Sequence, residues 1–375
     1  MMMPKYKPDI AIFLRCLYGG GAERGMLNLA HNFLLQKLTV DMVVAKAEGS
    51  LLEQLPVGIR LIDLNAQSKL GILPKLIQYL QRERPVSMLA ALHYPCEIAI
   101  LAKRIARVST RIVVSEHNNL SQEAKRIPQL SVRLTPLAVK LFYPWADAIV
   151  AVSQGVAEDL ANVTHLPRKR IDVIYNPVVT PEIFTKAKEP VNHPWFQPGE
   201  PSVILAVGRL YPQKDYPTLI RAFAQVRQVR RSRLVILGEG PEADSLNNLI
   251  RELGLEEDVA MLGFADNAYA YMAKAAVFVL SSAWEGFGNV LVEALAVGTP
   301  VVSTNCESGP SEILASGKYG DLTSVGDSKA MAEAILNVLA GNIKKVDFSW
   351  LNQFTSETCA EKYLQVLGVP TKALA

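Results

Sequence analysis

The chain has 375 residues, of which 50% are hydrophobic and 20% are charged. This composition is typical of a well-packed globular protein and excludes a disordered chain, and the length favours two domains over one. The four cysteines lack the CxxC spacing of a zinc site and are too few and scattered for a disulfide framework, so a reducing cytoplasm is expected. No apolar run approaches the roughly 18 residues that a membrane-spanning helix needs, so any membrane contact is expected to be peripheral.

The formal net charge of +3 conceals an asymmetry between the two halves of the chain. Residues 1–178 carry 22 Lys and Arg against 14 Asp and Glu, whereas residues 179–375 carry 17 against 22. A basic half suits an anionic partner such as a membrane surface, a lipid phosphate or a nucleic acid. An ordinary solvated basic surface is the alternative.

In the first half, short apolar runs alternate with segments of helical periodicity. The expected helices include residues 22–35 and 73–81, and the expected strands are residues 10–14, 40–45, 86–92, 111–115 and 148–152. Strands that are apolar on both faces and alternate with helices predict a parallel sheet covered on each side.

The alternation then stops and restarts. Residues 177–201 contain six prolines and no apolar periodicity, which is typical of a linker. Further strands are expected at residues 202–207, 234–237, 259–262, 277–280 and 300–303. The sequence therefore predicts an α/β protein of two units joined by a proline-rich hinge.

Ligands of open α/β sheets bind beyond the carboxyl ends of the strands, so the loops after the strands carry the functional hypotheses. After the first strand, Gly19, Gly20 and Gly21 permit close backbone approach to a ligand at the start of a helix. Arg24 stands where the dinucleotide fingerprint GxGxxG needs glycine, which argues against a dehydrogenase. A tight structural turn is the alternative for this loop.

Two further loops carry polar clusters. His117 lies in the run 115–119 directly after an expected strand, where it either meets a substrate or is a structural histidine next to a helix cap. Arg209 and Lys214 follow the strand at 202–207, and two cations beside a helix start suit a diphosphate. Solvated surface cations are the alternative for this pair.

The loop after the strand at 277–280 is the most specific. Glu285 precedes Gly286 and Gly288, a helix is expected to start near Asn289, and Glu293 lies about one turn inside it. Such a helix start can hold phosphate while the carboxylates meet sugar hydroxyls. A capped helix with two solvated glutamates is the alternative.

Taken in order along the chain, these motifs resemble those of retaining glycosyltransferases of the GT-B fold, family 4. The resemblance spans nearly the whole chain and is strongest in the paired glutamates Glu285 and Glu293 and in the Gly208–Asp215 loop. It implies two Rossmann-like domains facing across a cleft: an acceptor-binding domain at 1–178 and a nucleotide-sugar-binding domain at 179–349. A C-terminal helix at about 350–375 would cross back to the first domain.

The resemblance also implies roles for individual residues. The catalytic set would be His117, Arg209, Lys214 and Glu285, with the two cations neutralising the leaving diphosphate. The donor-binding set would be Gly20, Gly21, Arg209, Lys214, Gly238, Gly240, Phe264, Glu285, Gly286, Phe287, Gly288, Asn289, Val290, Leu291 and Glu293.

The implied reaction transfers a hexose or N-acetylhexosamine from a nucleotide diphosphate sugar, with retention, to a glycan or lipid-linked acceptor of cell-surface polysaccharide synthesis. Similarity of the run 306–314 to bacterial family members favours a UDP-sugar. The sequence has no DxD motif, so neither a metal nor another cofactor is expected, and Arg209, Lys214 and helix dipoles would take the metal's part.

The acceptor side is expected in the basic first half. Residues 121–145 place Lys125, Arg126, Arg133 and Lys140 among apolar residues, which suits contact with an anionic membrane at the inner face of the cytoplasmic membrane. An amphipathic helix packed on its sheet is the alternative. A nucleotide-sugar epimerase and a non-catalytic sugar-nucleotide-binding protein remain as rival functions. Nucleic-acid binding is the least favoured reading, because the basic excess is diffuse and no recognised nucleic-acid-binding module appears.

Overall fold

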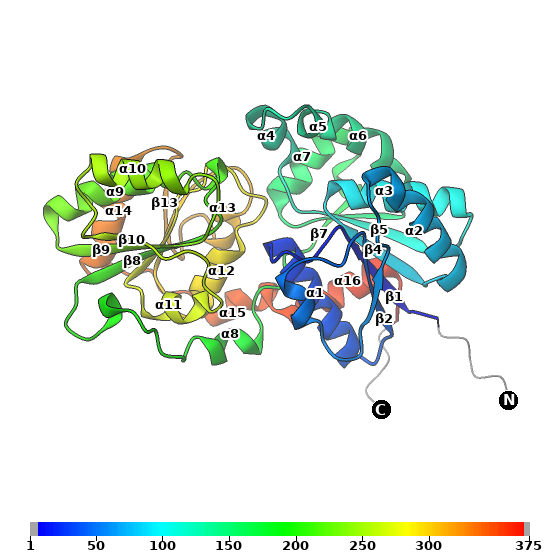
Figure 1. Ribbon diagram of the computed structural model, residues 1–375, viewed down its shortest axis with the longest axis horizontal. Coiled ribbons are helices and arrows are strands. Elements are labelled where there is room, and N and C mark those ends of the chain that lie inside the picture. Colours follow the sequence, from blue (N-terminus) through cyan, green and yellow to red (C-terminus); the bar gives the residue numbers. More distant parts are fainter. Residues whose placement is uncertain (1–6, 371–375) are drawn as a thin grey trace. The chain divides into compact units, whose positions relative to one another are not determined.

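The computed structural model describes residues 7–370. The chain forms two compact units, Met1–Val178 together with Gln353–Ala375, and Val179–Asn352 (Figure 1). Each unit is built on a parallel β-sheet with helices on its faces, so the expected α/β class is confirmed. The last five residues of the expected C-terminal helical segment, 371–375, lie outside the described residues.

The first unit has a seven-stranded sheet in the order β3-β2-β1-β4-β5-β6-β7. Its strands are β1 (Ile10–Leu14), β2 (Val40–Val44), β3 (Arg60–Asp63), β4 (Ser87–Ala91), β5 (Arg111–Glu116), β6 (Ala148–Ala151) and β7 (Ile171–Val173). Its α-helices are α1 (Gly21–Leu35), α2 (Lys69–Glu83), α3 (His93–Ala106), α4 (Leu120–Arg126), α5 (Leu130–Arg133), α6 (Thr135–Phe142), α7 (Gln154–Thr164) and α16 (Ser356–Leu367).

The second unit has a six-stranded sheet in the order β10-β9-β8-β11-β12-β13. Its strands are β8 (Ser202–Val207), β9 (Ser232–Leu237), β10 (Val259–Met261), β11 (Val277–Leu280), β12 (Val301–Thr304) and β13 (Asp321–Thr323). Its α-helices are α8 (Pro181–Lys186), α9 (Tyr216–Val229), α10 (Ala243–Glu252), α11 (Ala268–Lys274), α12 (Asn289–Ala296), α13 (Pro310–Ile313), α14 (Ser328–Leu339) and α15 (Phe348–Leu351).

The central strands are apolar on both faces because both faces are covered. Every residue of β1, β2 and β4 is buried. On one face of the first sheet, α1 and α16 pack into the same core, to which α16 contributes Cys359, Tyr363 and Leu367. The C-terminal helix α16 thus completes the core of the first unit, although it follows the second unit in the sequence.

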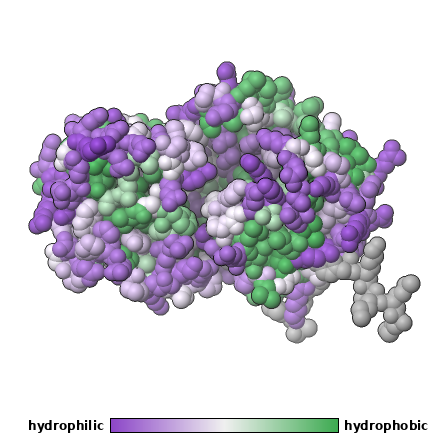
Figure 2. All heavy atoms as spheres, viewed as in Figure 1, coloured by the Kyte–Doolittle hydropathy of each residue, from purple (hydrophilic) through white to green (hydrophobic). Residues whose placement is uncertain are grey.

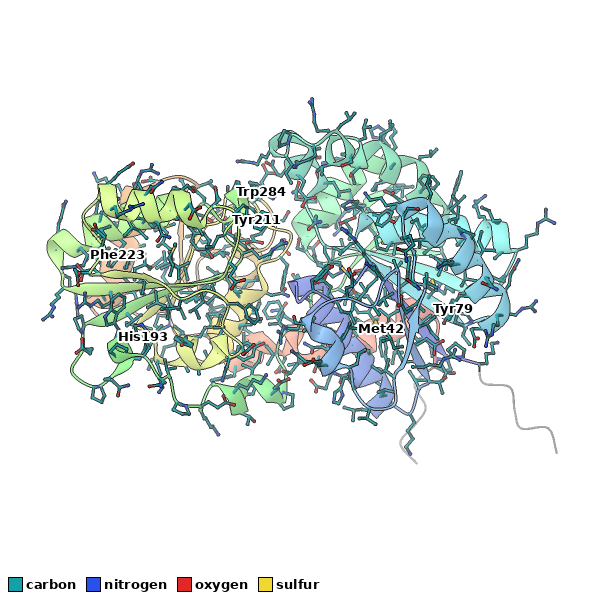
Figure 3. All side chains as sticks on the ribbon, in the orientation of Figure 1. Met42, Tyr79, His193, Tyr211, Phe223 and Trp284 are labelled. Atoms are coloured by element: carbon teal, nitrogen blue, oxygen red, sulfur yellow. The ribbon has the colours of Figure 1, made fainter. Side chains whose placement is uncertain are left out.

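The core of the second unit lies between its sheet and helices α9, α10 and α14. Phe223 of α9 is fully buried there (Figure 3), as are Leu219 of the same helix and Ile335 of α14. This layer holds the strands in parallel register, so the loops after them emerge along one edge.

The strands that the sequence pattern did not predict are β3, β7 and β13, which lie at sheet edges. In β3 burial alternates, because one face meets solvent, and the strand carries charges. Arg60 on β3 binds the fully buried Asp41 through two hydrogen bonds of 2.9 and 2.6 Å, and the hydroxyl of Tyr79 donates to the same carboxylate at 2.7 Å. A polar interaction thus anchors this edge, which apolar periodicity could not indicate.

The proline-rich segment 177–201 is not a featureless linker. It contains α8 and a short 3₁₀ turn, Pro194–Phe196, both of which begin at a proline. Proline at the first helical position costs nothing, because that N–H has no intrahelical partner.

Candidate active site

The sheet order of the second unit fixes where a ligand can bind. From β8 the chain moves outward to β9 and β10 and then returns to β11 on the other side of β8. The loops after β8 and β11 therefore diverge, and this switch point is where open α/β sheets bind their ligands.

Lys214 and Glu285 meet across this switch point. Lys214 follows β8 and Glu285 follows β11, and Lys214 Nζ lies 2.6 Å from Glu285 Oε1. The hydroxyl of Ser282 donates to the same oxygen at 2.7 Å. The Glu285 residue is only 6% exposed, so it is a fixed carboxylate with one oxygen fully engaged. Among residues 7–370, its other oxygen, Oε2, has no hydrogen-bond partner, which leaves an acceptor for a ligand hydroxyl.

Hydrogen bonds to backbone carbonyl groups hold the same two loops together. Ala283 N donates to Gln213 O at 2.8 Å, the side-chain amide of Gln213 donates to Trp284 O at 3.0 Å, and the Ser281 hydroxyl donates to Lys214 O at 2.7 Å. These three bonds flank the Lys214–Glu285 pair on both loops. The geometry of the pair is therefore set by the scaffold before any ligand arrives.

The glycines after β9 permit close packing of neighbouring loops. A Cβ at Gly238 would collide with the carbonyl oxygen of Gly208, and one at Gly240 with that of Leu210. Gly238 N also donates to Gly263 O at 2.7 Å, which brings the exposed Phe264 beside the same loop. The loops after β8, β9 and β10 thus form one continuous edge.

Helix α12 begins directly behind Glu285. Its N-cap is Gly288, whose φ of +98° suits glycine, and the helix starts at Asn289 as predicted. The N–H groups of a first helical turn and the helix dipole attract anions. Glu293 lies in the second turn and is partly exposed. The side chain of Leu291 is fully buried and its N–H donates to Gly288 O, so Leu291 supports the loop from the core.

Arg209 lies on the same edge but apart from the ion pair. It is exposed, and its guanidinium carbon is 5.2 Å from the ring centroid of Tyr211. Among the described residues it forms no ion pair, so its positive charge faces solvent uncompensated.

In the first unit the predicted site residues lie on the loops that follow β1 and β5. Gly20 is the N-cap of α1, with Gly21 as its first residue, and the Gly20 N–H donates to the Glu23 carboxylate. The Asn28 amide donates to Pro177 O at 2.8 Å, which ties α1 to the segment after β7.

His117 follows β5 and is held by a chain of hydroxyl groups. Its Nε2 lies 3.1 Å from Ser115 Oγ, which in turn lies 2.9 Å from the hydroxyl of Tyr363 on α16. The other ring nitrogen, Nδ1, is buried and has no hydrogen-bond partner among the described residues. Burial lowers the pKa of His117 to about 4, so the ring is neutral at physiological pH.

Glu116, beside His117, is a fully buried carboxyl group. Tyr143 donates to it at 2.9 Å, and the backbone N–H groups of His117 and Asn118 donate at 3.0 and 3.1 Å. Burial raises the pKa of Glu116 to about 8 in spite of these hydrogen bonds. The carboxyl group therefore orients the His117 loop, while Asn119 caps α4 through its side chain.

The structure thus distributes the predicted residues over two places. Gly20, Gly21 and His117 lie in the first unit, and the remaining predicted residues lie along one edge of the second. Sequence reasoning did not single out Ser282, Glu116, Tyr143 or Tyr363. Ser282 stands three residues before Glu285 and could have been suspected, whereas Tyr363 is 248 positions from Ser115 and nothing in the sequence joins them.

The second unit is a parallel α/β unit with cations, a carboxylate and a helix start at its switch point, where open α/β sheets bind their ligands. Two family models match the chain: Glycosyltransferase Family 4 over residues 19–181 and Glycosyl transferases group 1 over residues 188–349. The chain therefore belongs to glycosyltransferase family 4, and it is a transferase of the GT-B fold.

Curated relatives agree with this assignment. The chain is 32% identical, over 88% of its own length and 90% of the relative's, to the N-acetylgalactosamine-N,N'-diacetylbacillosaminyl-diphospho-undecaprenol 4-alpha-N-acetylgalactosaminyltransferase of Campylobacter jejuni. It is 26% identical to the N-acetyl-alpha-D-glucosaminyl L-malate synthase of Bacillus anthracis, over 78% of this chain and 77% of that one.

Solved structures share the fold. Anabaena HepE in complex with UDP and glucose superimposes with a TM-score of 0.77 at 23% identity, over 96% of this chain and 99% of that one. The lipopolysaccharide outer core galactosyltransferase WaaB gives a TM-score of 0.72 at 21% identity, over 96% and 98%. Across residues 7–370, no helix is both long and apolar enough to span a bilayer.

Proposed function

We propose that this protein is a retaining, metal-independent glycosyltransferase that moves a hexose or N-acetylhexosamine from a UDP-sugar to a lipid-linked or glycan acceptor of a surface polysaccharide. The observation that carries the proposal is the Lys214–Glu285 pair at the switch point of the second unit. The Campylobacter relative is named as acting on an N-acetylgalactosamine-containing diphospho-undecaprenol, WaaB is named as a lipopolysaccharide outer core galactosyltransferase, and HepE was solved with UDP and glucose.

In the proposed donor complex, the diphosphate lies before the start of α12. Lys214, which has two further N–H donors beside the one given to Glu285, and the exposed Arg209 neutralise the phosphate oxygens. Glu285 Oε2 accepts a hydrogen bond from a hydroxyl group of the transferred sugar, and the Glu293 carboxylate accepts hydrogen bonds from the ribose hydroxyl groups. Gly238, Gly240 and Phe264 lie along the edge towards the base.

Transfer needs charge stabilisation at the leaving group more than a covalent intermediate. The bond from the anomeric carbon to the phosphate oxygen breaks as the acceptor oxygen bonds to the same face of that carbon. The acceptor proton passes to the departing phosphate oxygen. Lys214 and Arg209 stabilise the negative charge that develops on the diphosphate, which is the task a metal ion performs in other transferases.

Calorimetric titration of the full chain with UDP, GDP and ADP tests the nucleotide first. We expect UDP to bind in the presence of EDTA and the Lys214→Ala variant to bind it more weakly. Absence of binding by all three nucleotides, or binding only with added Mg²⁺, contradicts the proposal.

Product analysis then tests the reaction. With a UDP-sugar and a lipid-diphosphate-linked acceptor, NMR of the new glycosidic linkage reports the anomeric configuration, which we expect to match that of the donor. Release of an epimerised sugar without acceptor would instead support a nucleotide-sugar epimerase.

The acceptor side of the proposal rests on α5 and α6. Leu130, Leu134, Leu137 and Leu141 recur at helical spacing and are each between 49% and 68% exposed. Figure 2 shows hydrophobic residues gathered over these helices. The basic residues around them are Lys125, Arg126, Arg133 and Lys140. An apolar stripe flanked by cations suits peripheral contact with an anionic membrane at the cytoplasmic face, where a lipid-linked acceptor is found.

A further inference from the structure

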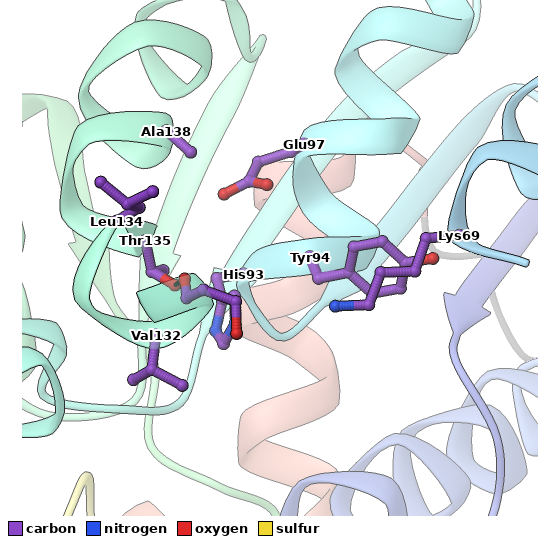
Figure 4. A pocket seen from close by; sticks show the side chains of 9 residues that line it. Lys69, His93, Tyr94, Glu97, Val132, Leu134, Thr135 and Ala138 are labelled. Carbon is purple, nitrogen blue, oxygen red and sulfur yellow. Dashed lines mark hydrogen bonds between the residues drawn. The ribbon is translucent and has the colours of Figure 1, made fainter. Parts of the chain in front are cut away.

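A cavity of about 220 Å³ lies in the first unit, apart from the residues assigned to the reaction above. Figure 4 shows His93 and Glu97 of α3 on the side of the first turns of α6, whereas the ring of Tyr94 extends the other way, beside Lys69. The residues that matter here are His93 and Glu97 on α3 and Leu134, Thr135 and Ala138 opposite them.

The position of the cavity is that of a ligand site. From β1 the chain moves outward to β2 and β3 and returns to β4 on the other side of β1, so the switch point of this sheet lies between β1 and β4. Leu92 follows β4 directly, with a φ of +70° that is unusual for leucine, and α3 starts at His93. The cavity-lining face of α3 therefore begins at the switch point.

Three polar atoms at this cavity lack partners. His93 Nδ1, the Tyr94 hydroxyl and Glu97 Oε1 are all buried and have no hydrogen-bond partner among the described residues. Burial raises the pKa of Glu97 to about 7 and lowers that of His93. A buried polar group without a partner destabilises the fold, so the two of these groups that lie on the α6 side, on His93 and Glu97, indicate a ligand that completes them.

The size and lining of the cavity limit what it can hold. A volume of about 220 Å³ exceeds that of a single water, whose share of liquid volume is about 30 Å³, and is below the roughly 300–1,000 Å³ of sites for drug-sized ligands. Glu97 disfavours an anion. Lys69, the one Lys or Arg among the described residues that line the cavity, is exposed and lies over the Tyr94 ring at 4.9 Å. The hydroxyl groups of a small sugar ring can bind the polar wall of the cavity, and the C–H face of the same ring can pack against Leu134 and Ala138.

We propose that this cavity binds one neutral sugar unit of the acceptor, with His93 and Glu97 hydrogen-bonded to its hydroxyl groups. The inference rests on the proposed function, whose acceptor is a glycan or glycolipid, and it assigns a sugar subsite to α3 and α6. The basic and apolar surface of α5 and α6 lies beside this site, because residues of both helices line the cavity.

Saturation-transfer NMR on the full chain tests this assignment with the methyl α-glycosides of glucose, galactose and their N-acetylated amino sugars. At least one glycoside is expected to bind the wild type. Glu97→Met keeps the volume and removes the carboxylate, and Ala138→Phe fills the cavity, so each is expected to weaken binding by about tenfold or more, as the loss of a charge-assisted hydrogen bond does. Glu361→Gln, an exposed site on α16, is the matched control and should bind like the wild type.

Thermal unfolding separates binding from folding. Glu97→Met removes a buried, unpaired carboxylate, so its Tm at pH 8 is expected to equal or exceed that of the wild type while sugar binding falls. No glycoside signal from the wild type, unchanged signals from both variants, or displacement of the glycoside by inorganic pyrophosphate at lower concentration overturns the assignment. UDP titration of the same samples reports on the proposed function separately, since neither variant touches the second unit.

Discussion

Lys214 and Glu285 bind each other at 2.6 Å from loops that follow different strands, with 16% and 7% of their side chains exposed. Each is therefore the main counter-charge of the other in a nearly dry site. A donor that approaches Lys214 finds an ammonium already oriented, because Glu285, Ser282 and the flanking backbone bonds hold the pair in place.

Removal of either partner should reduce turnover and stability together. Lys214→Ala and Glu285→Ala are each expected to lower turnover by roughly 100-fold or more and to destabilise the fold by about 3–5 kcal/mol, because a buried charge is left unpaired. The double variant should recover much of the stability and none of the activity. Denaturant unfolding and steady-state kinetics measure the two effects.

Lys186→Ala is the control for this cycle. Lys186 pairs with Glu182 at 2.6 Å on the surface of α8, where the loss of an ion pair is expected to cost less than about 1 kcal/mol. If the double variant is as unstable as either single one, the pair does not act as a mutually compensating unit.

His117 should make the stability of the protein depend on pH. Its folded pKa of about 4 lies below the usual value of 6.5, so the unfolded state binds more protons between these values. Stability from this residue is therefore fully present above about pH 6.5 and is lost as pH falls towards 4, by about 3 kcal/mol in total. Glu116 and Glu97 titrate in the same range with the opposite sign, because burial raises their pKa values. The difference in unfolding free energy between the wild type and His117→Gln, measured by chemical denaturation from pH 4.5 to 7.5, therefore isolates the His117 contribution, and we expect this difference to grow as pH rises.

The same group gives a direct spectroscopic check. The His117 ring signal in NMR should stay that of a neutral imidazole down to about pH 5. A midpoint near 6.5 would mean that the ring is solvated rather than buried.

Tyr363 should act on His117 through Ser115. Tyr363→Phe removes the hydroxyl that lies 2.9 Å from Ser115 Oγ, and we expect a loss of about 0.5–1.5 kcal/mol in stability. The ¹⁵N shifts of the His117 ring should also change, because the hydrogen bond at Nε2 sets which nitrogen carries the proton. Ser115→Ala should reproduce the change in ring shifts. Unchanged shifts in both variants would rule out this positioning role.

The exposed leucines of α5 and α6 should control membrane binding. Leu137→Ser with Leu141→Ser is expected to weaken co-flotation with vesicles of 30% anionic lipid severalfold, because apolar side chains and cations act together at such surfaces. Leu253→Ser, an exposed leucine of the second unit, is the matched control. Equal flotation of all three proteins, or none by the wild type on anionic vesicles, contradicts a membrane-contact surface.

The central architecture could be predicted from the sequence, because buried parallel strands read as continuous apolar runs. β1, β8 and β11 have the expected bounds, and α12 begins at the expected Asn289. The charged edge strand β3 escaped this reasoning, since Arg60 there is stabilised by a partner on β2 that no periodicity reveals.

For the active site, the sequence by itself determined which residue types follow which strands, because parallel strands deliver their carboxyl-terminal loops to one edge. Only the tertiary structure decided which of those residues meet. It pairs Lys214 with Glu285 and leaves the Arg209 side chain exposed to solvent. It also brings Tyr363 of the last helix to Ser115 beside His117. It also leaves His93 Nδ1 and Glu97 Oε1 of α3 without hydrogen-bond partners among the described residues at one cavity. Such contacts join residues far apart in the chain, and their distances follow from how the helices pack on the sheet rather than from any local pattern.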